Sequence, residues 1–467
     1  MITKINKKVV AGLFYSLLTP VSCLLIAVSC LLTSCKDEPD KYEIADGRPT
    51  ISFIRPVSAS SCDSIITAAS MQSTICIVGE NLRSVTGLLF NDQQAVLNTS
   101  YITDNTLIVT VPNEIPGTVT DKIYFATSSN DTVTYDFHVV IPGPVVASMS
   151  NEWAGPGEEV TIIGDYFLDY AEFPITVNFG ESYTLPRSAI KSISKTKIVF
   201  TMPENTPEEK VSVTSIYGKT EGAFKYRDTR GMLFDFDTPC KTGVVLGNHG
   251  WHNRDIVTDE TSLKGNYLIL GGAAMGDDGG WNDNNFSFEY WAGNWADPEN
   301  YAEYPRISDL ADFTDFETLN LKFEINIPKD NAWSAAPIQI YFGGVTQISQ
   351  GNAGVKDIYG NELGGCNNEF FRQQGKLPRA LYMPWKDTED LLYHTDGEWT
   401  TVTIPLTDFI YDFDGSKLSS GFVSAADFGS FNMFVIKGTY NDKTVLPLGV
   451  ACNPVIKIDN IRVVPNK

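Results

Sequence analysis

Two stretches of the 467-residue chain, Ile75-Cys-Ile-Val-Gly-Glu-Asn-Leu82 and Val160-Thr-Ile-Ile-Gly-Asp-Tyr-Phe167, share one pattern that decides the fold. Each is an apolar run, then a glycine, polar or aromatic residues and an apolar residue. Further matches follow at the same offset, Phe90-Asn91 with Phe179-Gly180 and then Leu107–Pro112 with Ile198–Pro203. They define a repeat of roughly 90 residues made of short strands and regularly spaced turns. Each copy is predicted to be a small β-sandwich.

The repeat resembles the IPT/TIG immunoglobulin-like domain. The resemblance covers 49–142 and 143–228, and it departs from the family pattern at Asn91, where a glycine is usual. It implies two immunoglobulin-like sandwiches in tandem, which would act as spacers. Pro142-Gly143-Pro144 between them would limit flexing, because proline fixes φ.

Residues 229–467 differ in composition from the repeats and hold seven of the eight Trp residues. The strands expected here are 232–236, 267–270, 286–290, 319–327, 338–342, 400–405, 431–437 and 455–464. The ends of this region resemble carbohydrate-binding jelly rolls, in which the first and last strands pair. That pairing would bring Asp235, Asp237 and Asp459 together, either as a weak candidate site for a structural Ca²⁺ or as turn-capping and solvated aspartates. Because strands are expected in both repeats and in 229–467, the predicted fold class is all-β: two immunoglobulin-like sandwiches followed by a larger jelly-roll-like β-sandwich.

The composition excludes several functions. Lys and Arg total 35 against 57 Asp and Glu, a net charge of -22 that would repel phosphate-rich partners, so no nucleic acid is expected. Hydrophobic residues make up 43% of the chain and aromatic residues 12%, which favours a folded β-protein over a disordered chain.

The N-terminus resembles a bacterial lipoprotein signal. Lysines precede an apolar stretch that ends in Leu32-Thr-Ser-Cys35. The resemblance implies a signal peptide over 1–34, acylation of Cys35 and a tether over 35–48; a plain secretory signal or a membrane helix is the alternative. Lys36-Asp37-Glu38 resembles the signal that directs lipoproteins of Bacteroidota to the outer face of the outer membrane.

Five other cysteines remain in the mature chain: Cys62, Cys76, Cys240, Cys366 and Cys452. An odd number without paired C-x-x-C spacing argues against a zinc site or a full disulfide framework. Cys62 and Cys76 could form a disulfide, or Cys76 could be a buried thiol in its apolar strand.

Aromatic residues in polar, glycine-rich surroundings are the candidate glycan-binding site. A sugar ring stacks on an indole face, while its hydroxyls need polar partners. The candidates are Trp251, Trp281, Tyr290, Trp291, Trp295, Trp333 and Trp385. The alternative for each is a core position, which is the interpretation for Trp399, because that residue opens an alternating strand.

The whole mature chain resembles the surface glycan-binding proteins of Sus-type polysaccharide utilisation systems. The resemblance implies a non-catalytic lipoprotein that captures a β-linked plant glucan, of the xyloglucan or mixed-linkage type, beside a TonB-dependent transporter. No cofactor is implied. The platform of the family's xyloglucan-binding domain resembles the segment around Tyr290-Trp291, with an earlier Trp that corresponds to Trp251 or Trp281.

Two other functions remain open at this point. A glycoside hydrolase would need two carboxylates about 5 to 10 Å apart. Asp283, Glu289, Glu299 and Glu369 are available, but no local motif selects a pair. A protein-binding adhesin with an immunoglobulin-like stalk is the other alternative, since aromatic side chains also serve protein interfaces.

Overall fold

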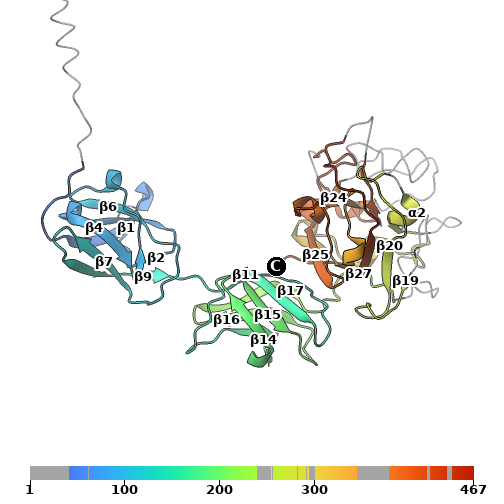
Figure 1. Ribbon diagram of the computed structural model, residues 1–467, viewed down its shortest axis with the longest axis horizontal. Coiled ribbons are helices and arrows are strands. Elements are labelled where there is room, and N and C mark those ends of the chain that lie inside the picture. The colour runs from blue at the N-terminus through green and yellow to red at the C-terminus, as the bar shows by residue number, and fades with distance from the viewer. Residues whose placement is uncertain are drawn as a thin grey trace, which may run out of the picture. The chain divides into compact units, whose positions relative to one another are not determined.

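The computed structural model describes residues 42–467 except 62, 239–253, 255, 281, 291, 294–299, 344–377, 418–420 and 439–443, and leaves out the side chains of 59, 283 and 426. The signal and tether before residue 42 lie outside this part. The chain forms two compact units, Met1–Pro142 and Gly143–Lys467, which we describe separately (Figure 1). Within the described residues, no helix has the length and apolar character needed to cross a membrane.

The first unit is a β-sandwich. One sheet has the order β1 (Thr50–Pro56), β3 (Thr74–Glu80) and β6 (Thr106–Thr110). The other has the order β5 (Gln93–Gln94), β4 (Val85–Phe90), β7 (Lys122–Thr127) and β8 (Thr132–Asp136). A parallel pair joins β2 (Ala68–Ser70) and β9 (His138–Val140). The apolar residues of β3, β4 and β7 alternate inward, so Ile77, Leu88 and Phe125 are fully buried.

The second sandwich repeats this plan at the start of the second unit. One sheet runs β10 (Val145–Met149), β11 (Glu159–Asp165), β15 (Lys197–Thr201), β14 (Ile190–Ser194). The other runs β13 (Tyr183–Thr184), β12 (Thr176–Phe179), β16 (Lys210–Ser215), β17 (Gly218–Lys225). The departure at Asn91 has a physical reason: φ is +56° at Asn91 and +64° at Gly180, and asparagine tolerates this left-handed conformation better than other non-glycine residues.

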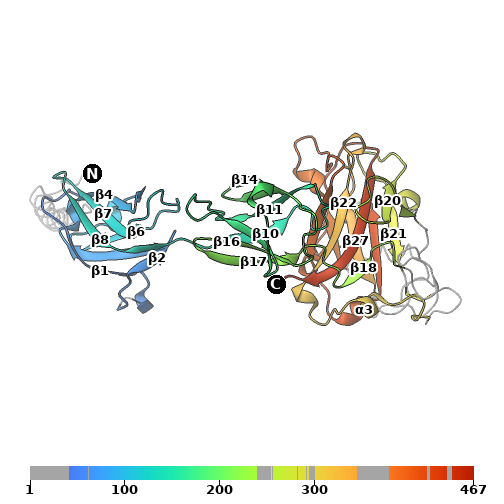
Figure 2. The same cartoon turned by 90° about the horizontal axis from the view of Figure 1, so that it is seen from below.

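The C-terminal domain is a larger two-sheet sandwich (Figure 2). One sheet has the order β19 (Ile256–Val257), β20 (Tyr267–Gly271), β27 (Val455–Pro465), β22 (Leu319–Asn326), β25 (Trp399–Pro405), and β18 (Met232–Phe234) also pairs with β27. The other has the order β21 (Ser287–Tyr290), β26 (Ser430–Val435), β23 (Ile338–Gly343), β24 (Arg379–Tyr382). The predicted pairing of first and last strands is confirmed, with Met232 opposite Arg462.

Helical segments are short in the described residues. The α-helices are α2 (Asp283–Phe286) and α3 (Ile307–Leu310). The 3₁₀ turns are η1 (Ala59–Ser61), η2 (Leu82–Ser84), η3 (Thr99–Tyr101), η4 (Arg187–Ala189), η5 (Phe316–Thr318), η6 (Lys329–Asn331), η7 (Pro384–Asp387), η8 (Leu406–Asp408) and η9 (Ala425–Asp427). The all-β prediction is therefore confirmed.

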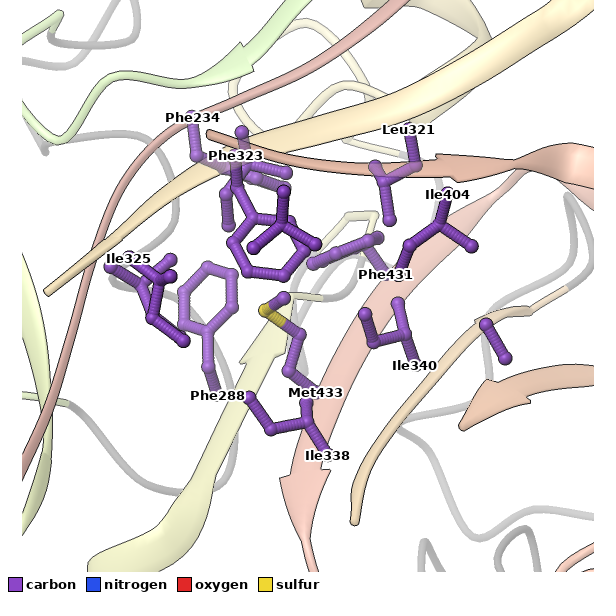
Figure 3. Packing of buried hydrophobic residues seen from close by; sticks show 14 of the residues in the cluster. Phe234, Phe288, Leu321, Phe323, Ile325, Ile338, Ile340, Ile404, Phe431 and Met433 are labelled. Atoms are coloured by element: carbon purple, nitrogen blue, oxygen red, sulfur yellow. The ribbon is translucent and has the colours of Figure 1, made fainter. Parts of the chain in front are cut away.

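The core of the C-terminal domain lies between its two sheets (Figure 3). Phe323 from β22 faces Phe288 and Phe431 from the opposite sheet, and all three are at most 1% exposed. The ring of Phe234 meets that of Phe288 edge to face, with 5.2 Å between centroids. Burying each such side chain contributes roughly 1.5–3 kcal/mol, so this core is a large share of the domain's stability.

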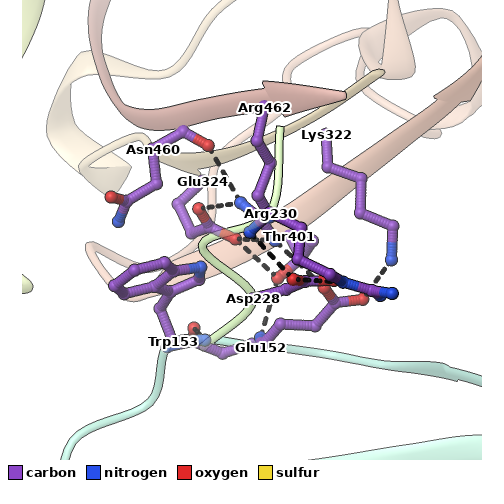
Figure 4. Close-up of polar contacts among 10 residues, drawn as sticks. Glu152, Trp153, Asp228, Arg230, Lys322, Glu324, Thr401, Asn460 and Arg462 are labelled. Carbon is purple, nitrogen blue, oxygen red and sulfur yellow. Dashed lines mark hydrogen bonds and ion pairs between the residues drawn. The ribbon is translucent and has the colours of Figure 1, made fainter. Parts of the chain in front are cut away.

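Buried charges join the second sandwich to the C-terminal domain (Figure 4). Arg462 on β27 donates from Nη1 to Glu324 Oε2 at 2.8 Å and from Nη2 to Glu152 Oε2 at 3.0 Å. Lys322 forms an ion pair with the same Glu152, and Thr401 donates to Glu324 Oε1 at 3.1 Å. The two acids and two bases balance, and each is at most 5% exposed. Glu152, from the second sandwich, is thus held by two strands of the C-terminal domain.

Backbone contacts reinforce the same junction. Thr401 donates its amide to Ser150 O at 2.9 Å, and its hydroxyl accepts from the Glu152 amide at 2.8 Å. The Arg462 guanidinium also lies over the Trp153 ring at 5.8 Å. Arg230 pairs with the buried Asp228 in the connecting segment. The second sandwich and the C-terminal domain therefore pack into one unit.

Asp235, Asp237 and Asp459 are the weak candidates for a Ca²⁺ site, with turn capping as the alternative; among the described residues, no group of three or more acidic, His or Cys side chains is placed to hold a metal ion. Asp235 instead caps a turn by accepting from the Thr238 amide at 2.8 Å. Asp237 accepts from the Asn266 amide at 2.8 Å. These aspartates satisfy backbone donors, which is the turn-capping alternative.

Cys76 is buried and free among the described residues, as the buried-thiol alternative expects; Cys62 lies outside the described residues, so the disulfide between them stays a prediction. Burial raises the pKa of the Cys76 thiol. A protonated thiol in an apolar strand packs as a small hydrophobic residue.

Candidate glycan-binding face

The outer face of the sheet formed by β21, β26, β23 and β24 carries a polar row. Successive side chains of a strand point to opposite faces. Phe288, Phe431 and Ile340 face the core, so their neighbours face outward. The strand register aligns four outward residues in one line across the sheet: Glu289, Asn432, Tyr341 and Arg379. All four are at most 3% exposed, so the row lies within the domain.

Arg379 organises one end of this polar row. Its Nη1 donates to Gln339 Oε1 at 2.9 Å, and its guanidinium lies 4.9 Å over the Tyr341 ring. Tyr341 in turn stacks against Phe434 with 6.3 Å between ring centroids and 19° between planes. Burial lowers the pKa of Arg379 and raises that of Tyr341 well above its ordinary range. The row is thus a rigid layer of donors, acceptors and rings.

Three donors of this row have no acceptor among the described residues. Asn432 Nδ2, Arg379 Nε and Arg379 Nη2 are buried without a hydrogen-bond partner there. A buried donor without a partner costs about 1–3 kcal/mol of stability. The sequence signal for the row is the alternation of polar and apolar residues in Ile338-Gln-Ile-Tyr-Phe342 and in Ser430-Phe-Asn-Met-Phe434, which the sequence analysis did not use.

The described residues next to the predicted Trp platform are tied to one another. Arg254, three residues after Trp251, hydrogen-bonds Asn284 O, three residues after Trp281. Asn282 caps α2 by accepting from the Asn285 amide at 3.2 Å, and Asn285 Nδ2 donates to Gly271 O at 2.9 Å. The chain segments that carry the two tryptophans therefore start from neighbouring positions. Trp251, Trp281, Trp291 and Trp295 themselves lie outside the described residues.

Tyr290 is not a surface platform residue. It is fully buried in the core cluster, its ring centroid lies 5.1 Å from that of Phe234, and its hydroxyl donates to Pro305 O at 2.7 Å. The reason is strand alternation, because Tyr290 shares the inward face of β21 with Phe288. Gly293, three residues on, is fixed by donating to Tyr304 O at 2.8 Å.

Trp333 and Trp385 are also core residues, so their assignment to the platform is wrong. Both are fully buried, and both indole Nε1 atoms donate to the same acceptor, Ala336 O, at 2.9 and 3.2 Å. Their polar neighbours in sequence suggested exposure. The structure satisfies each indole N–H internally instead, as buried tryptophan requires.

The structure also places Trp399 and one of the possible hydrolase carboxylates. Trp399 is 8% exposed, and its ring meets that of Tyr267 edge to face at 5.6 Å, which confirms its core position. Glu289, a possible hydrolase carboxylate, lies in the buried polar row. Glu299, Glu369 and the side chain of Asp283 lie outside the described residues.

The comparisons with known proteins agree with this architecture. Residues 226–465 match the model of the surface glycan-binding protein B xyloglucan binding domain. The chain belongs to the surface glycan-binding protein B family. Residues 144–228 match the IPT/TIG domain model. The crystal structure of the surface glycan-binding protein PbSGBP-B from Prevotella bryantii is 60% identical, with a TM-score of 0.79, and the match covers 91% of this chain and 100% of that one.

A curated relative, an IPT/TIG domain-containing protein from Bacteroides ovatus, is 28% identical over 208 residues. That match spans 42% of this chain and 41% of the relative. It therefore relates only part of the two proteins. The resemblance to surface glycan-binding proteins drawn from the sequence is confirmed by the family model and by the Prevotella structure.

Proposed function

We propose that this protein captures a β-linked plant glucan, of the xyloglucan or mixed-linkage type, at the bacterial cell surface without cleaving it. The observation that carries the proposal is the family match over 226–465, which spans the whole C-terminal sandwich. The ligand class follows from the name of that family, a xyloglucan binding domain.

The proposed platform consists of Trp251, Trp281, Trp291 and Trp295. One described contact and the side-chain alternation of β21 support it. Arg254 and Asn284 link the segments that carry Trp251 and Trp281. Trp291 follows Tyr290, whose side chain points into the core, so an extended strand would turn Trp291 outward on the face of Glu289.

The proposed platform also needs polar partners for the sugar hydroxyls. Sugar rings need an aromatic face and, at their edges, hydrogen-bond partners. Trp291 would supply the ring, whereas Asn432 and Arg379 of the polar row are at most 2% exposed and would support the platform from within the domain. A site of two or three stacking contacts gives micromolar to millimolar affinity, and avidity along a polymer compensates for that weakness.

We further propose that Cys35 carries a lipid that anchors the protein to the outer membrane, with the glycan site facing the cell exterior. The sequence Leu32-Thr-Ser-Cys35 supports the anchor, and Lys36-Asp37-Glu38 supports the outer face. A neighbouring TonB-dependent transporter would receive the captured glycan. Labelling intact cells with an impermeant reagent tests the location: the wild-type protein should react, and Cys35→Ala should appear in the medium or periplasm.

Affinity electrophoresis tests the binding itself. Protein comprising residues 36–467 would be run through gels that contain xyloglucan, mixed-linkage β-glucan, mannan, xylan or starch, with a gel lacking polysaccharide as the control. We expect retardation by xyloglucan or mixed-linkage β-glucan and no release of reducing ends. Retardation by none of the five would contradict glycan capture and favour an adhesin, whereas new reducing ends would indicate a hydrolase.

A further inference from the structure

The two immunoglobulin-like sandwiches differ at one sheet edge. In the second sandwich β14 pairs with β15, from Ile190 opposite Phe200 to Ser194 opposite Lys197. The equivalent strand of the first sandwich, β6, ends its sheet. Among the described residues, its outer edge meets only the isolated bridge between Ile102 and Leu107. The first sandwich therefore lacks the strand that completes the second.

The outer edge of β6 exposes main-chain groups of identifiable residues. The Val111 amide donates inward to Ser73 O at 2.9 Å, while Thr106 O accepts from Thr103 on the outer side at 2.8 Å. Backbone direction alternates along an antiparallel strand. The N–H and C=O groups of Ile108 and Thr110 therefore point outward, away from β3. The close contact of the Thr74 and Thr110 hydroxyls, 3.1 Å apart, is typical of a pair that exchanges no backbone hydrogen bonds.

A groove of about 800 Å³ runs along this edge. Seven consecutive residues, 108–114, line it, of which 108–110 belong to β6. Because alternate side chains of a strand point to opposite faces, consecutive lining residues mean that the groove meets β6 along its edge. Its other wall holds Val96 and Tyr101, which are 88% and 57% exposed. Among the described lining residues, Glu114 alone carries a charge.

We propose that the first sandwich binds an extended polypeptide strand of a partner protein, which adds to β6 in the groove. The occupant is identified by the second sandwich, where β14 fills the same position with an alternating segment, Ile190-Lys-Ser-Ile-Ser194, whose Ile190 and Ile193 pack on the core. An open strand edge supplies the main-chain hydrogen bonds, and the apolar wall of the groove accepts alternate side chains. The near-neutral lining favours a segment that is itself uncharged at the inward positions.

A peptide of the sequence Arg-Ser-Ala-Ile-Lys-Ser-Ile-Ser-Lys-Thr, residues 187–196 of the second sandwich, is the probe. Its binding to the protein comprising residues 36–467 would be followed by fluorescence anisotropy of a labelled peptide. Thr110→Pro removes one outward N–H of β6 and leaves the ladder with β3 intact. Thr134→Pro is the matched control, because Thr134 is also exposed on an edge strand, β8, of the opposite sheet.

We expect saturable peptide binding by the wild-type protein and by Thr134→Pro, and a loss of at least tenfold in affinity for Thr110→Pro at an unchanged thermal unfolding midpoint. Equal binding by all three proteins, or no saturable binding by any, would overturn the proposal. Sedimentation that reveals a wild-type dimer abolished by Thr110→Pro would overturn it in favour of a second copy as the occupant. Xyloglucan oligosaccharide that displaces the bound peptide would overturn it in favour of a sugar groove. Xyloglucan binding by the C-terminal domain should be the same in all variants. A negative result for peptide binding would therefore leave the proposed glucan capture unaffected.

Discussion

At the scale of single residues, Asp459 is a buried acid whose pKa is raised far above its ordinary value. Burial raises its pKa to about 9; the Asn460 amide lowers it, and the carboxylates of Glu324, Asp237 and Asp235 raise it further. An unfolded aspartate titrates near a pKa of about 3.9. Because the folded state holds the proton more tightly, this group's contribution to stability is complete below about pH 4 and is lost as the pH rises towards 9.

Asp459→Asn removes this titration while keeping the shape of the side chain. We therefore expect the free energy of unfolding of Asp459→Asn to rise relative to wild type between pH 5 and pH 8, with an upper bound of roughly 4 kcal/mol. Chemical denaturation at several pH values measures the difference. Glu324, whose pKa burial raises to about 7, titrates in both proteins and largely cancels. Parallel stability profiles for the two proteins would contradict the buried, protonated state of Asp459.

At the scale of elements, the eight strands expected in the C-terminal domain all form, because each contains an alternating or continuous apolar run. β19 and β24 were missed. The first is two residues long, and the second is four residues between Pro378 and Pro384, too short for a periodic signal. Sequence reasoning also placed Trp333 and Trp385 on the surface. Only the fold shows that Ala336 O accepts from both indoles, because that acceptor is a backbone group on a turn.

Trp333→Ala distinguishes a core role from a binding role. Removing a fully buried indole leaves a cavity and should cost about 3–5 kcal/mol of unfolding free energy, measured by chemical denaturation. Trp291→Ala, in the proposed platform, should leave the unfolding free energy within about 0.5 kcal/mol of wild type. If Trp333→Ala had the stability of wild type but no longer bound glucan, the core role would be contradicted and Trp333 would be a binding residue.

At the scale of the whole molecule, the sequence analysis predicted the order of the domains but not how they join. The repeat and the change in composition near residue 229 were visible in the sequence. The junction was not, because Glu152 is 170 residues from Lys322 and 310 residues from Arg462 in the chain, and only the packing brings them together. The polar row was also not predicted, because its four residues come from four different strands and line up only through the register in which those strands pair.

The buried charges of the junction should contribute measurably to the free energy of unfolding. Glu152→Ala leaves Arg462 and Lys322 buried with one carboxylate fewer, and breaking a buried pair in this way costs about 3–5 kcal/mol. Glu159→Ala is the control, because its ion pair with Lys191 is exposed and worth at most about 1 kcal/mol. Calorimetry should show that Glu152→Ala lowers the unfolding temperature of the second unit. Equal, small effects of the two variants would mean that the junction is not held by these charges.

Glucan capture by the Trp platform is most directly tested by isothermal titration calorimetry of xyloglucan into the wild-type protein and into Trp291→Ala. We expect saturable binding in the micromolar to millimolar range for the wild type, its loss in Trp291→Ala, and no reducing ends in the sample cell after the titration. Unchanged affinity in a folded Trp291→Ala protein would contradict the platform, and the release of reducing ends would contradict capture without cleavage.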